Sequence, residues 1–66
     1  MHKFLIAEYS DEYGTIIDTK VQSFPDWALA EQYCRDAHRA MTKLFVKGVY
    51  VNEQLVTDQQ QFNSSK

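Results

Sequence analysis

The sequence predicts a small α+β domain of order ββαββ, in which one helix packs on one face of an antiparallel sheet. Two strand-like runs, 3–9 and 15–22, flank a short turn segment, and apolar residues at helical spacing follow Pro25. A chain of 66 residues, 44% of them hydrophobic, suffices for one domain with a thin core. We therefore expect a single domain over residues 1–62 and a flexible tail over residues 63–66.

The first two strands are expected to form a hairpin. Residues 10–14 make the turn, and Gly14 can adopt the left-handed conformation that closes a four-residue loop. One face of the hairpin should pack on the helix. Because it leaves Asp18 and Lys20 in water, we expect the following set to face the helix: Phe4, Ile6, Ile17 and Val21.

Residues 23–26 are expected to start a helix that runs to about Ala40 or Met41. Ser23 can cap its N-terminus, and Asp26 complements the positive end of the helix dipole. Pro25 fits the first turn, where its missing N–H costs nothing. The apolar residues of this stretch share one side of the helix and alternate with charged residues on the other side.

Residues 44–51 are expected to form the third strand, and residues 52–54 the turn after it. A shorter fourth strand should run from Leu55 to about Gln59, before a frayed tail. Strict alternation in the third strand divides its apolar residues into two sets: Leu44, Val46 and Tyr50 on one side, and Phe45, Val49 and Val51 on the other.

One helix can cover only one face of such a sheet, so apolar side chains should remain on the other face. Leu5, Tyr9 and Ile16 belong to this open face, together with one side of the third strand, including Tyr50. If contiguous, they form a patch of a few hundred Å², a size that often marks a binding site. Alternatively, the tail or the fourth strand covers them, or they are scattered singly.

Composition and charge limit which partners and which cellular compartment fit this chain. Nine acidic and seven basic residues give a net charge of −2, which argues against a strongly basic nucleic-acid binder. One cysteine cannot form an internal disulfide, and no apolar run approaches the ~20 residues of a membrane span. The apolar run 4–7 is too short for a signal peptide. We expect a cytoplasmic protein, in a bacterial host, without membrane partners.

Cys34 and His38 are the residues with the clearest chemical potential, since their spacing can place two ligands on one metal. A second ligand pair is missing from the pattern. The same residues could form a nucleophile–base pair, but Cys34 lies on the core side of the helix, and no oxyanion hole or orienting acid is evident. We expect no enzymatic activity, no metal and no cofactor.

Charge is unevenly distributed along the chain. Arg35, Arg39 and Lys43 follow at four-residue spacing and predict a ridge along the helix end, with Lys47 beyond it. Such a ridge could bind phosphates weakly, or it could simply complement the helix dipole.

Acidic residues gather around the first hairpin loop, at Glu8, Asp11 and Glu12. An acidic loop can engage a basic groove of a partner protein, including a groove built for nucleic acid. The alternative is a solvated loop without a binding role.

Two resemblances bear on function. The segments 45–52 and 55–58 resemble the last hairpin of a small RNA-binding domain shared by a ribosomal small-subunit protein, tyrosyl-tRNA synthetases and pseudouridine synthases. That family's usual glycine is Glu53 here, and its two basic helices are replaced by one helix of mixed charge. This resemblance implies RNA binding. Independently of it, the basic residues give an alternative function, a nucleic-acid-binding module that uses Arg35, Arg39, Lys43 and Lys47.

In size and element order the whole chain is similar to small phage and mobile-element proteins: anti-CRISPR inhibitors, phage antitoxins and inhibitors of host RNA polymerase. The likeness lies in the hairpin 3–22, the helix start 26–30 and the strand 44–51. It implies a non-enzymatic inhibitor that occludes a site on a bacterial protein complex. The expected interface residues are Leu5, Tyr9, Asp11, Glu12, Tyr13, Ile16 and Tyr50. A structural homodimer that pairs open faces or edge strands is a further alternative.

Overall fold

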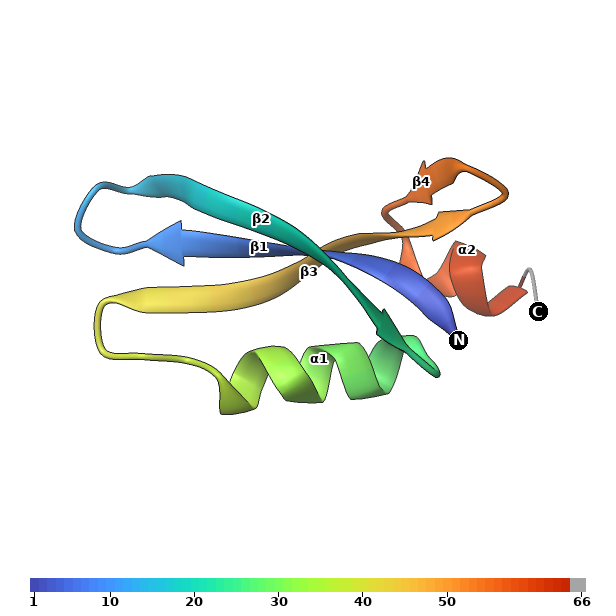
Figure 1. Cartoon of the computed structure of the whole chain (residues 1–66), viewed down its shortest axis with the longest axis horizontal. Coiled ribbons are helices and arrows are strands. Elements are labelled where there is room, and N and C mark those ends of the chain that lie inside the picture. Colours follow the sequence, from blue (N-terminus) through green and yellow to red (C-terminus); the bar gives the residue numbers. More distant parts are fainter. Residues whose placement is uncertain (65–66) are drawn as a thin grey trace.

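A computed structural model describes residues 1–64, which form a four-stranded antiparallel sheet and two helices (Figure 1). The elements in chain order are β1 (His2–Ser10), β2 (Thr15–Phe24), α1 (Trp27–Asp36), β3 (Thr42–Val51), β4 (Gln54–Val56) and α2 (Gln59–Ser64). Across the sheet the strand order is β2-β1-β3-β4. The predicted α+β class with an antiparallel sheet is confirmed, and α2 is an additional element.

The first hairpin closes as predicted. Gly14 adopts a φ of 67°, and its N–H donates to the Ser10 carbonyl oxygen at 2.8 Å. The second hairpin has a shorter loop than the first: Asn52 and Glu53 alone join β3 to β4. Both residues adopt positive φ, as two-residue hairpin turns require.

The face assignment of β2 differs from the prediction. Val21 lies opposite Leu5 and Lys20 lies opposite Ile6, and residues directly opposite each other share a face. Lys20 and Asp18 therefore lie on the side of α1, and the expected inward placement of Ile17 and Val21 is wrong. Ile17 is a bulged residue, and the shift that it introduces determines which side of the sheet the rest of β2 faces. Lys20 stays exposed there because β2 is the margin of the sheet, where its ammonium group donates to the Tyr33 hydroxyl.

Strict alternation also fails in β3, for a related reason. Gly48 pairs with Leu5 while Val46 pairs with Ile6, so Lys47 is an extra, bulged residue. The bulge places Val49 on the same face as Val46, and Tyr50 on the opposite face. Gly48 was the available signal, because glycine inside a strand often marks a bulge or a close backbone approach. A Cβ at Gly48 would lie 2.8 Å from the Val56 carbonyl oxygen of β4.

Helix α1 is shorter than predicted and is capped by a different residue. Asp26 is the N-cap, and its carboxylate accepts the Leu29 N–H at 2.9 Å, whereas Ser23 belongs to β2. The helix ends at Asp36, before the predicted Ala40 or Met41. Because β3 begins at Thr42, residues 37–41 are needed to reverse the chain.

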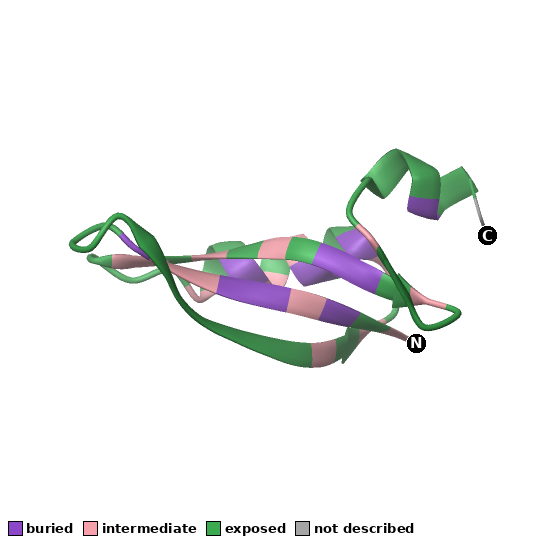
Figure 2. Cartoon of the chain, turned by 90° about the horizontal axis from the view of Figure 1, so that it is seen from above, coloured by how far each residue is buried: buried purple, intermediate pink, exposed green. Residues whose placement is uncertain are grey.

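The core lies between the sheet and the two helices, with the Phe4 ring at its centre. Phe4 makes edge-to-face contacts with Phe24, Trp27 and Phe62, at centroid distances of 5.9, 5.8 and 5.9 Å. Figure 2 shows α1 behind the sheet. Buried residues of the cluster are Phe4, Ile6, Trp27, Ala30, Cys34, Val49 and Phe62.

The C-terminal segment forms a second helix, α2, which the sequence analysis did not predict. The Asp58 carboxylate accepts the Gln60 N–H at 2.9 Å and begins α2, which buries Phe62 to 2% exposure. The predicted fourth strand extends only over Gln54–Val56. Residues 63 and 64 of the expected tail belong to α2, and residues 65–66 lie outside the described part of the chain.

Candidate functional site

The sheet face opposite the helices carries a continuous set of large apolar side chains. Pairing places Tyr9 opposite Ile16, Leu5 opposite Val21, and Tyr50 opposite Leu55. Phe45 lies opposite Ala7, which is fully buried at the centre of this face. We call this set the open-face patch: Leu5, Tyr9, Ile16, Val21, Phe45, Tyr50 and Leu55.

The structure brings together four of the predicted interface residues, Leu5, Tyr9, Ile16 and Tyr50, on this one face. It adds three that the sequence analysis missed, namely Val21, Phe45 and Leu55. Exposure of Val21 is 53% and that of Phe45 is 40%, which is high for large apolar side chains. Val21 and Phe45 were missed because of the two bulges, since each bulge changes which residues of a strand share a face.

Neither described helix covers the open-face patch. Trp27 of α1 and Phe62 of α2 both contact Phe4, which lies on the other face of β1. The alternative that the tail covers the open face is therefore not met by residues 59–64. Figure 2 looks onto the sheet with α1 behind it and with exposed positions along nearly all of β2.

The acidic hairpin loop borders the patch at the end formed by Tyr9 and Ile16. Tyr13 is 72% exposed, and its N–H donates to the Ser10 hydroxyl at 3.2 Å. Asp11 lies 4.0 Å from the Lys43 ammonium group, an exposed ion pair of small energetic value. The predicted loop residues Asp11, Glu12 and Tyr13 are all exposed beside the patch.

The predicted basic ridge is not formed as one row. Arg35 lies on α1, but Arg39 lies after the helix end, where its N–H donates to the Thr42 carbonyl oxygen at 3.0 Å. Lys43 lies opposite Tyr9 on the open face, and Lys47 is the bulged residue of β3. The ridge required a helix that continued through residue 43, and α1 ends before it.

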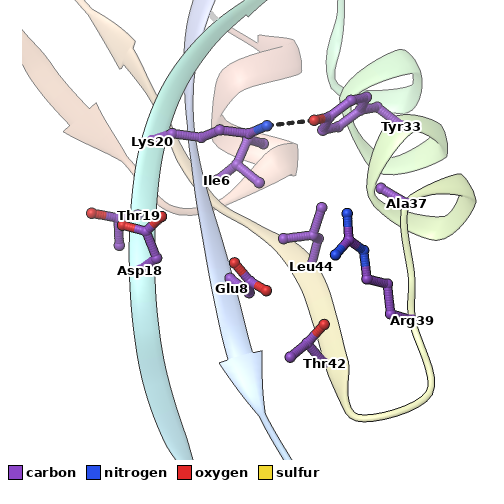
Figure 3. A pocket seen from close by; sticks show the side chains of 10 residues that line it. All are labelled: Ile6, Glu8, Asp18, Thr19, Lys20, Tyr33, Ala37, Arg39, Thr42 and Leu44. Atoms are coloured by element: carbon purple, nitrogen blue, oxygen red, sulfur yellow. Dashed lines mark hydrogen bonds between the residues drawn. The ribbon is translucent and has the colours of Figure 1, made fainter.

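A hollow of about 230 Å³ opens between the end of α1 and the sheet (Figure 3). Glu8 and Asp18 line it from the two strands of the hairpin, and Lys20 and Arg39 contribute opposite charge. Lys20 is already engaged, since its ammonium group lies 4.9 Å from the centre of the Tyr33 ring and donates to the Tyr33 hydroxyl. With two acidic and two basic side chains, the hollow favours ligands of neither charge sign.

Cys34 and His38, the residues with possible metal or nucleophile chemistry, have different surroundings. Cys34 is buried, and burial, reinforced by the charge of Glu31, raises the pKa of its thiol. His38 lies beyond the end of α1, and its Nε2 donates to the Leu44 carbonyl oxygen at 2.9 Å. Among residues 1–64, no three His, Cys, Asp or Glu side chains are grouped so that they could hold a metal ion.

The described helices are also too short and too polar to cross a membrane. Comparison with known family models, with curated proteins and with solved structures gives no match.

Proposed function

We propose that this protein is a non-enzymatic binding module that docks on a partner protein through the open-face patch. The observation that carries the proposal is a set of large apolar side chains on one sheet face that no described helix covers. Those of β2, β3 and β4 are exposed, and Leu5 and Tyr9 of β1 are half-buried among them. Soluble domains rarely leave a contiguous apolar patch of more than a few hundred Å² without a function.

The patch has the composition of an interaction surface. Tyr9 and Tyr50 supply aromatic rings with a polar hydroxyl, and tyrosine is enriched among the residues that dominate binding energy. Their strands are central in the sheet, so the backbone beneath them is hydrogen-bonded on both sides near Tyr50 and along β1. A rigid base of this kind keeps the entropic cost of docking low.

The acidic loop supports a partner whose apolar surface is bordered by basic residues. Asp11, Glu12 and Tyr13 project at one end of the patch, where they would meet such a border first. Complementary charge of this kind accelerates encounter and fixes orientation more than it adds affinity. The weak Asp11–Lys43 pair can be exchanged for a pair with the partner.

The biological context that we propose is a phage- or mobile-element-encoded modulator acting in the bacterial cytoplasm. By occupying a basic-rimmed site on a bacterial complex, the chain would occlude that site without catalysis and without a cofactor. The support for this context is the similarity in size and element order to small phage-encoded inhibitors, together with the acidic loop beside the patch.

Affinity capture from bacterial lysate tests this function with matched variants. We expect the wild type to retain a specific protein, and the double variant Tyr9→Ser with Tyr50→Ser to lose it at least tenfold, roughly the effect of removing one strong anchor. Gln32→Ser, an exposed position on α1 away from the patch, is the control and should retain the protein. Equal recovery by the double variant and the wild type would exclude the open-face patch as the docking site.

A further inference from the structure

The outer edge of β2 is a long strand edge that no described strand pairs. β2 spans ten residues and forms one margin of the sheet. The other margin is short or already occupied: β4 has three residues, and the carbonyl oxygens of Thr42 and Leu44 accept from Arg39 and His38. A long free edge in a soluble protein is a template for pairing with another strand.

The hydrogen bonds at the end of the hairpin show which backbone groups of β2 face outward. The Ser10 carbonyl oxygen accepts from Gly14, on the side of β2, and the Asp11 N–H donates to Met41, on the side of β3. Along an antiparallel strand, the backbone N–H and C=O groups of successive residues point alternately to the two neighbouring strands. The even-numbered residues of β1 therefore bond to β2. Their partners Asp18 and Lys20 turn their backbone groups inward, which leaves those of Thr19 and Val21 directed outward.

The sequence of β2 is self-complementary about Thr19. In an antiparallel pair of identical strands centred on this residue, Asp18 of each copy lies opposite Lys20 of the other. Ile17 of each copy then lies opposite Val21 of the other. We propose that two copies of this chain pair through their β2 edges, across a two-fold axis at Thr19, to form one continuous eight-stranded antiparallel sheet.

The two registers centred one residue to either side are disfavoured by charge. Centring the axis on Asp18 would place two carboxylates opposite each other, and centring it on Lys20 would place two ammonium groups opposite each other. The outward direction of the Thr19 backbone also suits the axis, because the two copies of Thr19 can exchange both N–H···O bonds. Charge and hydrogen-bond direction therefore both favour the Thr19 register over its two neighbours.

This pairing leaves the open-face patch free and does not depend on the proposed function. A two-fold axis perpendicular to the sheet places the helices of both copies on one side and both open-face patches on the other. The pairing is short, because the bulge at Ile17 bends β2 at the end of the central stretch. A single short strand pair is a small contact compared with the ~800 Å² per partner of a standard interface, so we expect dissociation constants of roughly 10–1,000 μM.

Sedimentation equilibrium between about 10 μM and 1 mM at low salt tests the proposal, in the concentration range set by that expectation. We expect wild type to dimerise, and Asp18→Lys to weaken dimerisation about tenfold or more, because two unlike pairs become two like pairs. Asp36→Lys is the matched control: it makes the same charge change at an exposed position of α1 and should leave the dimer intact.

Two charge swaps sharpen the test. The double variant Asp18→Lys with Lys20→Asp restores both unlike pairs and should dimerise again. The single variants Asp18→Lys and Lys20→Asp should each self-associate at least about tenfold more weakly than wild type, and should form heterodimers when mixed. Because Lys20 also contacts Tyr33, the fold of each variant is first checked by the fluorescence of Trp27.

Amide hydrogen exchange supplies a readout that needs no substitution. In wild type, exchange at the Thr19 and Val21 amides should slow as concentration rises, while the inward amides of Asp18 and Lys20 should be protected at all concentrations. A wild type that stays monomeric up to 1 mM would overturn the proposal. So would a dimer that Asp18→Lys does not weaken, or protection that appears elsewhere than at Thr19 and Val21.

Discussion

Replacing Phe62 with alanine tests whether the C-terminal helix is part of the core. The Phe62 ring is 2% exposed and lies against three rings, at 5.0 Å from His2, 5.9 Å from Phe4 and 6.1 Å from Trp27. Truncating a phenylalanine in such a site costs about 3–5 kcal/mol. A domain of 66 residues has only about 3–10 kcal/mol of stability in total.

We therefore expect Phe62→Ala to lose a third or more of the free energy of unfolding. Helix α2 has six residues, too few to persist alone, so it should melt and expose Trp27 to water. Urea denaturation followed by circular dichroism measures the loss, and Trp27, the single tryptophan, should shift its emission to longer wavelength.

The control is Gln60→Ala, which alters an exposed side chain of the same helix and should change stability by less than about 0.5 kcal/mol. A Phe62→Ala variant within about 1 kcal/mol of wild type, with unchanged Trp27 emission, would refute the reasoning, because such a small loss is outside the range for a buried phenylalanine.

Three further outcomes can be checked by simple measurements. Gly48→Ala should destabilise the protein by about 1–3 kcal/mol in urea unfolding, because its Cβ would meet the backbone of β4 at 2.8 Å; a neutral effect would contradict the close approach. Asp26→Ala should cost about 1 kcal/mol by loss of the helix cap, whereas Asp36→Ala at the other end of α1 should not destabilise. Because the pKa of the Cys34 thiol is raised, the folded state binds this proton more tightly than the unfolded state. The protonated thiol therefore favours the folded state below the ordinary thiol pKa. This stabilisation is lost as pH rises through the raised pKa of the folded state. Alkylation of Cys34 at pH 8 should accordingly be slow in the native protein and rapid in urea, and rapid native labelling would contradict burial.

Much of the fold could be predicted from the sequence because the local signals agree with one another. Gly14 closes the first hairpin loop with positive φ, as its lack of a side chain predicted. The apolar spacing after Pro25 predicted α1, and Trp27, Ala30 and Cys34 are its buried residues. These features depend on residues close together in the chain, where propensity and pattern are most informative.

The candidate site could be predicted only in part, because membership of a face depends on register. Leu5, Tyr9 and Ile16 lie on the open face as expected, whereas Val21 joined them against expectation. One bulged residue reverses the face of every residue that follows, and a hydrophobic pattern alone does not locate it. The same uncertainty applied to the helix end, which moved Arg39 out of the predicted ridge.

By itself, the sequence determined the α+β class, the hairpin, the central helix and the surplus of apolar residues over what one helix can cover. Only the tertiary structure decided where that surplus lies. The Phe62 ring packs against Phe4 and Trp27. The C-terminal segment is therefore a second helix on the core side of the sheet and does not cover the open face. The physical reason is that burial stabilises contacts between residues that are distant in the chain. Strand register and chain reversal, rather than local preference, decide which of those residues meet.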